Sequence, residues 1–420
     1  MTSEESGPTI GVKPWVKAAE TRAVIEALEA AGGAGCARFV GGCVRNALIG
    51  QPVADIDIAT TLTPDRVIEA LKAAKLKAVP TGVEFGTVTA VSGGKPFEIT
   101  TLRRDVETDG RHAVVAYTDD WAEDAARRDF RLNALYADPD GRLFDPTGAG
   151  EADARAGRVV FVGDPETRIR EDGLRILRFF RFLAWYGRGE PDAAALAACE
   201  AMKGALITLS AERIAKELLK LLAADDPRPA MRLMAATGIL SLIVPEARGL
   251  ARFERLVEIE SDLFQCDALL RLAALLPDEP AVGAATAERL RLSNAQRDRL
   301  IAALGTQPRL VSWLSPREAR RSIYKIGVDA FCDRVMLGWA GSERRAAAIQ
   351  WRALLPMARS WPRPSFPITG AEVMAAGVPE GPMVGEVMRE VEAWWIDQDF
   401  IDDKLSIVER LKSVAQGMAY

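Results

Sequence analysis

The chain divides into two stretches whose hydrophobic patterns predict different secondary structure. Strand-like patterns are concentrated between Ala37 and Asp145, whereas from Pro165 onward one helical spacing follows another and strand signals nearly vanish. This division predicts an α+β protein, with a small mixed sheet followed by an all-α arm. The expected strands are Ala37–Val40, Ile56–Thr60, Gly86–Val91, Phe97–Leu102 and Asn133–Ala137.

Helices are expected on both sides of the strand region. Trp15–Ala31 has amphipathic spacing, and Pro64–Ala74 follows the start signal Thr63-Pro64. The proline-rich segment Trp361–Pro367 is the clearest linker, and Ile368–Phe400 is expected to form a terminal helical unit. Further predicted helices are Leu196–Met202, Ala211–Ala223, Pro229–Ala236, Ala284–Leu304 and Asp329–Leu337.

Length and composition exclude several classes of protein. A chain of 420 residues is too long for one core and is expected to form two to four units. The net charge of −5 argues against broad, unspecific coating of nucleic acid, although it permits a local basic groove. A single histidine, His112, excludes sites that need several histidines, such as a binuclear phosphohydrolase centre.

Cysteine spacing and hydropathy indicate a soluble protein of the cytoplasm. The five cysteines show no C-x-x-C spacing, so neither a zinc site nor a disulfide framework is expected, which fits a reducing compartment. Met1–Pro8 has no apolar signal region, and no window reaches ~18 apolar residues, so no membrane partner is expected.

The segment Phe39–Gly50 reads as a strand, a double-glycine turn and a short helix. At Gly41-Gly42 the backbone can turn tightly and approach a ligand closely. The free N–H groups at the start of the following helix, which includes Val44–Leu48, are suited to phosphate oxygens. A plain turn is the alternative interpretation of the two glycines.

Two acids follow this segment. Asp55 and Asp57 alternate along a predicted strand, so they are expected on the same side, roughly 6.5 Å apart. Carboxylates this close repel one another unless a cation joins them, and Mg²⁺ prefers carboxylates together with substrate phosphates. Solvated acids at the end of a strand are the alternative. Together with the phosphate site, the pair suggests metal-assisted chemistry on a nucleoside triphosphate.

Two further stretches add candidates. Glu98 lies on a strand that could neighbour the one bearing Asp57, where it could share a metal or accept a proton, or be an ordinary surface glutamate. Arg103–Glu123 is rich in polar residues and reads as a mobile loop, in which His112 is expected to make a loop contact.

Arginines dominate the remaining motifs. Arg127-Arg128 leads into an apolar strand and suits a triphosphate, unless it is an ordinary surface pair. On the helix that follows Glu171-Asp172, three arginines fall within a ~120° stripe that also includes apolar residues, so this face is expected to meet something. The stripe consists of Arg175, Arg178 and Arg181.

Asp172 and Arg175 together offer an acceptor and donors. This pair matches the edge shared by cytosine and adenine, where an exocyclic amino donor lies next to a ring-nitrogen acceptor. Guanine and uracil present the reverse order and would leave buried polar groups unpaired. Ser210, farther along, is expected to cap a structural helix that includes Arg213.

Taken together, these motifs resemble the class II tRNA nucleotidyltransferase and poly(A) polymerase family, within the polymerase β-like nucleotidyltransferases. The resemblance covers Phe39 to about Leu222 and returns at Ile368–Met374 with Gly381-Pro382. It implies addition of CCA to the 3′ end of tRNA from CTP and ATP, with Mg²⁺ as cofactor and no DNA partner. It also implies a head at 34–146 after an N-terminal helical segment at 1–33, a neck at 147–224, a helical body at 225–360 and a tail at 361–420 that contacts tRNA.

Carried over by position, the resemblance assigns roles to individual residues. Asp55 and Asp57 would hold Mg²⁺. Asp57, Glu98 and a metal-bound hydroxide are the candidates for the proton acceptor, and the sequence does not choose among them. The nucleotide would be bound by Gly42, Arg45, Arg128, Asp172, Arg175, Arg178 and Arg181. The segment Asp109–His112 resembles a flexible loop associated with the switch from C to A addition. The chain departs from the family at Asn46, commonly Asp, and at Arg131, often Thr.

Three rivals remain open from the sequence. A poly(A) polymerase often carries a basic tail, whereas the C-terminal stretch here contains Asp397, Asp399, Asp402 and Asp403. A CC-only enzyme is disfavoured by the presence of the Asp109–His112 loop. A non-catalytic RNA-binding protein on a degenerate fold is disfavoured because such a protein needs no paired metal carboxylates.

Overall fold

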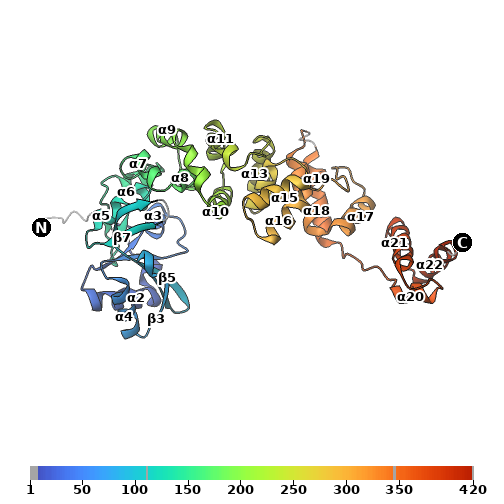
Figure 1. Ribbon diagram of the computed structural model, residues 1–420, viewed down its shortest axis with the longest axis horizontal. Helices are drawn as coiled ribbons and strands as arrows, with labels where there is room; N and C mark the ends of the chain where they lie inside the picture. Colours follow the sequence, from blue (N-terminus) through green and yellow to red (C-terminus); the bar gives the residue numbers. More distant parts are fainter. Residues whose placement is uncertain (1–7, 110–111, 344–346, 419–420) are drawn as a thin grey trace. The chain divides into compact units, whose positions relative to one another are not determined.

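The computed structural model describes residues 8–109, 112–343 and 347–418, and the chain divides into two compact units, Met1–Pro245 and Glu246–Tyr420. The strands lie in the first unit, whereas the second is built from helices (Figure 1). The predicted α+β architecture, a mixed sheet followed by an all-α arm, is confirmed.

Seven strands of the described residues form one sheet in the order β3-β4-β5-β2-β1-β8-β9. β2 and β5 run parallel, and the other neighbouring pairs are antiparallel. The parallel pair brings together two strands that are separated in the sequence by α4, β3 and β4. The strands are β1 (Ala37–Val40), β2 (Asp57–Thr60), β3 (Lys77–Gly82), β4 (Thr87–Ser92), β5 (Lys95–Thr101), β8 (Tyr136–Ala137) and β9 (Leu143–Phe144).

The two faces of the sheet differ in burial. Helices α2 (Ala19–Gly32) and α4 (Pro64–Ala73) pack together and contact β4, and Val88 and Ile99 are fully buried. Burial alternates strictly along β4, so Thr87 and Thr89, on the opposite face, stay half-buried. This alternation follows from the two-residue period of a strand with one face in the core.

The prediction of a loop over Arg103–Glu123 is wrong. The segment forms a two-stranded hairpin, β6 (Arg103–Asp109) and β7 (His112–Tyr117), in which Arg103 pairs with Tyr117. Gly110 and Arg111 lie outside the described residues. The run His112–Tyr117 is rich in Val, Ala and Tyr, so its strand tendency outweighs the polar and glycine-rich composition of its surroundings.

Other boundaries also differ from the expectations. The fifth expected strand, Asn133–Ala137, is shortened to β8 because the 3₁₀ helix η2 (Arg131–Asn133) occupies its beginning. β3 was not anticipated from its mixed sequence. β2 begins at Asp57, so Asp55 lies before the strand, exposed and outside the expected alternation.

The first unit continues into a helical region after β9. The expected helix Trp15–Ala31 is divided at Ala18, whose ψ of 138° is not helical. The remaining helices of this unit are α1 (Pro14–Lys17), α3 (Gly42–Ile49), η1 (Val83–Phe85), α5 (Trp121–Ala126), α6 (Gly150–Ala156), α7 (Pro165–Glu171), α8 (Leu174–Tyr186), α9 (Ala193–Ala201), η3 (Lys203–Thr208), α10 (Ala211–Leu222), α11 (Arg228–Ala236) and α12 (Ile239–Ile243).

The second unit is helical throughout its described regular structure. The expected helix Ala284–Leu304 is two helices, because Ser293 and Gln296 form a capping box that starts a new one. The helices are α13 (Ala251–Leu263), α14 (Ala268–Leu275), α15 (Pro280–Arg289), α16 (Asn294–Ala303), α17 (Pro316–Ile326), α18 (Val328–Ala340), α19 (Ala348–Ser360), α20 (Gly370–Ala375), α21 (Pro382–Asp397) and α22 (Lys404–Met418).

The last three helices share a hydrophobic core that includes Val373, Val391 and Leu411. Tyr324 and Phe366 pack against this core from α17 and from the segment before α20. Among the helices that the structure describes, none combines the length and apolarity needed to cross a bilayer.

Candidate active site

A polar cavity of about 390 Å³ lies within the first unit, where the ends of β1 and β2 face the beginning of α8. Its walls come from segments far apart in the sequence, and they combine a glycine turn, a carboxylate and several arginines. The lining residues are Gly41, Gly42, Asp57, Arg127, Arg128, Asp129, Asn133, Asp172, Leu174, Arg175, Arg178 and Arg213.

The glycine turn connects β1 to α3 as the sequence predicts. Gly41 has a φ of +70°, which residues with a side chain rarely adopt, and its N–H donates to the carbonyl of Leu135. Gly42 is the first residue of α3 and lines the cavity. The first N–H groups of an α-helix have no partner within the helix, so the beginning of α3 can bind phosphate oxygens.

Asp57 and Glu98 are paired in register across the parallel strands β2 and β5, as expected for a neighbouring strand. Burial, followed by the charges of Glu98 and Asp55, raises the pKa of Asp57 from 3.8 to about 6, and Arg128 opposes this shift. Asp55 therefore lies close enough to act on Asp57 although it stands outside the strand. Glu98 thus adds a third negative charge beside Asp55 and Asp57.

The described residues contain no group of three or more acidic, cysteine or histidine side chains arranged to hold a metal ion. The carboxylates of Asp55 and Asp57 nevertheless fit a divalent cation. Burial and the charges of Glu98 and Asp55 raise the pKa of Asp57, and a cation at these carboxylates would offset that repulsion. Hard oxygen ligands of this kind, with substrate phosphates completing the shell, suit Mg²⁺.

Asp124 is a buried carboxylate that holds the arginine pair. Its side chain is 1% exposed and accepts hydrogen bonds from Arg127 Nη2 at 2.6 Å, Arg128 Nη2 at 2.9 Å and the Tyr136 hydroxyl at 2.7 Å. Burial alone would raise the pKa of Asp124, but Arg128 and Arg127 outweigh it and lower that pKa to about 2. The position of both guanidinium groups therefore depends on this ionised acid.

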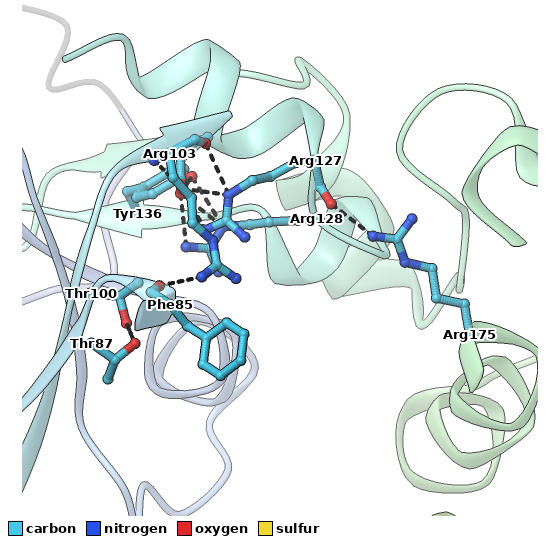
Figure 2. Close-up of polar contacts among 9 residues, drawn as sticks. Phe85, Thr87, Thr100, Arg103, Arg127, Arg128, Tyr136 and Arg175 are labelled. Carbon is cyan, nitrogen blue, oxygen red and sulfur yellow. Dashed lines mark hydrogen bonds and ion pairs between the residues drawn. The ribbon is translucent and has the colours of Figure 1, made fainter. Parts of the chain in front are cut away.

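Three arginines connect the base of the β6–β7 hairpin to α8 (Figure 2). Arg175 Nη2 donates to the carbonyl of Arg127 at 3.0 Å, and Arg127 Nε donates to the carbonyl of Arg103 at 3.0 Å. Arg103 in turn donates to the carbonyl of Phe85. Each arginine thereby donates to the backbone of the next segment.

Asp172 and Arg175 both line the cavity, but their side chains bond to different partners. Asp172 Oδ2 accepts from Arg213 Nη2 at 2.8 Å, and its Oδ1 accepts from the N–H of Leu174. Arg175 donates to Glu171 and to the carbonyl of Arg168. Arg213, which the sequence placed in a structural helix only, is therefore a cavity residue that was missed.

The expected arginine stripe lies on α8, and its apolar members Leu174 and Phe182 are buried, 7% and 2% exposed, so this face is in contact with other residues, as expected. Arg178 lines the cavity and donates to Asp129 Oδ2 with its Nε at 2.8 Å. Arg181 donates to Glu217 at 2.6 Å and is absent from the cavity wall that the structure describes. Arg181 thus forms an ion pair with α10, and its nucleotide contact stays a prediction.

Arg45 also lies away from the cavity wall described above. It is 5% exposed, stacks on the ring of Tyr186 at 3.8 Å and donates to the Tyr186 hydroxyl at 2.6 Å. It also donates to Asn133, a lining residue, and to Asn46 Oδ1 at 2.8 Å. Arg45 therefore positions Asn133 in this structure, and Asn46 supplies an acceptor for it where the family commonly has Asp.

The second departure from the family pattern has a local partner as well. Arg131 lies on η2 and pairs with the buried Asp153, with 3.8 Å between Nη1 and Oδ2. Its charge is thus directed toward Asp153, on α6. It does not appear among the cavity-lining residues that the structure describes.

Several residues that line the cavity or contact its lining carried weak sequence signals. Asn133 and Asp129 both line the cavity. The sequence placed Asn133 in a predicted strand and Asp129 in the segment before it. Asp124 precedes Arg128 by four residues, a spacing that brings side chains together on a helix and could have identified it. Arg213 carried no such signal, because α10 is far along the chain.

The chain matches two described families. Residues 37–160 match the Poly A polymerase head domain, and residues 190–250 match the probable RNA and SrmB-binding site of polymerase A. The chain is 31% identical to the mitochondrial CCA tRNA nucleotidyltransferase 1 of Mus musculus, covering 89% of this chain and 86% of the relative. It is 30% identical to the CCA-adding enzyme of Levilactobacillus brevis, covering 92% and 96% of the two chains.

Solved structures share the fold over almost the whole chain. The CCA-adding enzyme of Bacillus stearothermophilus in complex with CTP matches with a TM-score of 0.76 and 24% identity, covering 96% of this chain and 99% of that one. The CCA-adding enzyme of Thermotoga maritima complexed with tRNA matches with a TM-score of 0.66 and 20% identity, covering 97% and 96%.

Proposed function

Because the chain belongs to the family of CCA-adding tRNA nucleotidyltransferases, we propose that its cavity binds CTP and then ATP and transfers their nucleotides to tRNA. The protein is a transferase that adds CCA to the 3′ end of tRNA without a nucleic-acid template. The observation that carries the site assignment is that Asp57, Arg128, Asp172 and Arg175 line one cavity.

The reaction is a displacement at the α-phosphate. The 3′-hydroxyl oxygen of the tRNA forms the new bond to phosphorus, the bond from that phosphorus to the bridging oxygen breaks, and pyrophosphate leaves. The proton of the hydroxyl passes to a carboxylate, for which Asp57 and Glu98 are the candidates in the first unit. Asp57 lines the cavity, and Glu98 lies beside it in register on β5.

We assign the triphosphate to the beginning of α3 and to the arginine pair. The first turn of α3, which begins at Gly42, offers backbone N–H groups, and Arg128 and Arg127 offer guanidinium donors that Asp124 holds in place. Arg178 supports the nucleotide from α8. Enzymes of this kind use a divalent cation; we propose Mg²⁺, held by Asp55 and Asp57, which would supply charge neutralisation at the phosphates.

Base selection is assigned to Asp172 and Arg175. An acceptor next to a donor complements cytosine and adenine and leaves guanine or uracil with unpaired groups. For Arg175 to reach a base, its bond to the Arg127 carbonyl is exchanged for bonds to the nucleotide. The bond from Arg213 holds the carboxylate of Asp172 in the cavity while this happens.

The proposal is tested with tRNA that ends before CCA, offered each nucleoside triphosphate separately and then mixed. A ladder that extends by two residues with CTP alone, and by a third when ATP is added, is expected. Runs of A with ATP alone would indicate a poly(A) polymerase, extension that stops after two C would indicate a CC-only enzyme, and no extension would indicate a binding protein.

We propose that this activity resides in the cytoplasm. All five cysteines lie in the described residues, and none forms a disulfide, which fits a reducing compartment. Because some relatives are named as mitochondrial, family membership alone does not determine the compartment. Fractionation of cells that produce the tagged protein, with the activity followed in each fraction, tests the assignment.

A further inference from the structure

The open face of β3, β4 and β5 continues directly from the cavity at Asp57. Side chains in register across these strands share this face: Asp57 opposes Glu98, and Glu98 opposes Thr89. The next row contains Thr100 and Thr87, whose hydroxyls lie 3.1 Å apart. Thr81 extends the face onto β3 through a 2.8 Å hydrogen bond to Thr89.

The sheet order separates this face from the phosphate site. In the order β3-β4-β5-β2-β1, the glycine turn follows β1, whereas the threonines lie on the far side of Asp57. In a displacement at phosphorus, the attacking hydroxyl and the leaving pyrophosphate lie roughly in line on opposite sides. A triphosphate bound at the glycine turn therefore leaves the β5–β4 side for the attacking hydroxyl.

An exposed aromatic ring stands at the margin of the same face. Phe85 is 52% exposed, and its carbonyl is held by Arg103, which fixes the backbone without using the ring (Figure 2). Tyr117, 42% exposed, lies against the neighbouring Gly86, within 3.1 Å of where a Cβ would stand. Phe85 adjoins the row of Thr87 and Thr100, which lies ~7 Å along β5 from Glu98.

We propose that this face binds the single-stranded 3′ end of the RNA acceptor, with the ring of Phe85 stacked on its terminal base. Aromatic side chains beside a sheet bind unpaired bases through their π-faces, whichever base is present. Threonine hydroxyls can donate to and accept from ribose hydroxyls, which single out RNA. Arg103 adds a positive charge for the phosphodiester. The inference rests on the proposed function, since it names where the second substrate of that reaction lies.

The test replaces Phe85 by alanine, leucine or tyrosine and measures the dissociation constant for tRNA lacking CCA by fluorescence anisotropy. Phe85→Ala is expected to weaken acceptor binding by about 5- to 100-fold, the contribution of one base–aromatic stack. Phe85→Tyr is expected to retain wild-type binding. Phe85→Leu, which keeps bulk but has no ring, is expected to bind as poorly as the alanine variant. The KM for CTP is expected to stay unchanged.

An acceptor whose 3′-terminal nucleotide is abasic supplies the matched control. Wild type and Phe85→Ala are expected to bind it equally, because the base that would stack is missing. A similar loss on both acceptors, full binding by Phe85→Ala or rescue by leucine would overturn the proposal. Wild type that extends tRNA while Phe85→Ala binds normally refutes this inference alone, whereas wild type that adds no nucleotide refutes the proposed function.

Discussion

Arg213 on α10 donates a 2.8 Å hydrogen bond to the carboxylate of Asp172, just before α8. Asp172 is the acceptor half of the pair assigned to base selection, and its other oxygen is occupied by the N–H of Leu174. The orientation of a base-selecting group is thus set by a residue about forty positions farther along the chain. This relationship leads to the first prediction.

Arg213→Gln is expected to reduce base selection. Without the guanidinium, the carboxylate of Asp172 can rotate. The difference in binding free energy between cytosine and a mispaired base is then expected to become smaller. A hydrogen bond to a charged group contributes about 1.5–3 kcal/mol, but this pair is partly exposed, so the expected loss of discrimination is about tenfold. The measurement is the ratio of kcat/KM for UTP and GTP to that for CTP.

Two variants calibrate this result. Asp172→Ala removes the acceptor itself and is expected to lower discrimination further. Arg155→Gln breaks an exposed pair with Glu151 on α6 and is expected to leave it unchanged. An unaltered ratio for both Asp172→Ala and Arg213→Gln would remove base selection from this part of the cavity.

Asp57→Asn is expected to abolish nucleotide addition while tRNA binding stays near normal. The amide cannot carry the negative charge that a divalent cation or a proton transfer requires. Loss of several kcal/mol of transition-state stabilisation corresponds to a fall in kcat of about 10³-fold. Single-turnover incorporation of CMP and a separate tRNA-binding assay measure the two effects. Asp65→Asn, at an exposed position of α4, is the matched control. Persistent turnover by Asp57→Asn would contradict the role of this carboxylate.

Asp57→Asn is also expected to stabilise the metal-free protein near pH 7.5. The pKa of Asp57 is raised to about 6 by burial and by Glu98 and Asp55, so the folded state binds more protons than the unfolded state between about pH 4 and 6. Stability therefore falls as the pH rises through this range, and the cost of the ionised group, on the order of 1–3 kcal/mol, is complete above it.

The measurement is thermal unfolding of wild type and Asp57→Asn in a chelator, from pH 4.5 to 7.5. The variant is expected to unfold a few degrees higher at pH 7.5, and the difference is expected to shrink toward pH 4.5. Saturating Mg²⁺ is expected to favour wild type selectively. A difference that stays constant with pH would show that the repulsion among the three acids does not cost stability.

Asp124→Asn is expected to be strongly destabilising. The change leaves Arg127 and Arg128 without their shared buried carboxylate, and breaking a buried pair costs about 3–5 kcal/mol. Because the pKa of Asp124 is lowered to about 2, its contribution is complete above about pH 4 and is lost as the pH falls toward 2. Denaturant unfolding at pH 7 and pH 3 is expected to show a larger difference from wild type at pH 7. Equal differences at both values would argue against the ionised form.

The sequence predicted those elements whose signals are local. β1 was predicted with its observed bounds, and α4 was predicted to within one residue, because a strand run before glycines and a Thr-Pro start depend on neighbouring residues alone. The arginine stripe of α8 and the pairing of Glu98 beside Asp57 were also anticipated.

What the sequence could not supply was the choice of partner for each charged group. An arginine stripe on a helix does not reveal that Arg181 pairs with Glu217 while Arg178 reaches Asp129, because these acids come from distant segments. The sequence likewise did not show that Tyr186 and Asn133 accept hydrogen bonds from Arg45, whose nucleotide contact stays a prediction. The composition of Arg103–Glu123 predicted a loop, whereas the segment forms a hairpin. The reason is that hairpin formation depends on cross-strand pairing, which is a non-local interaction.

The β6–β7 hairpin forms a small sheet of its own, and its two strands leave and re-enter the domain side by side, with Arg103 opposite Tyr117. Lengthening or shortening such a ribbon by paired residues would leave the register at its base untouched. Insertions and deletions of this kind would therefore leave the seven-stranded sheet unchanged. A hairpin of another length would therefore leave the residues that line the cavity where they are.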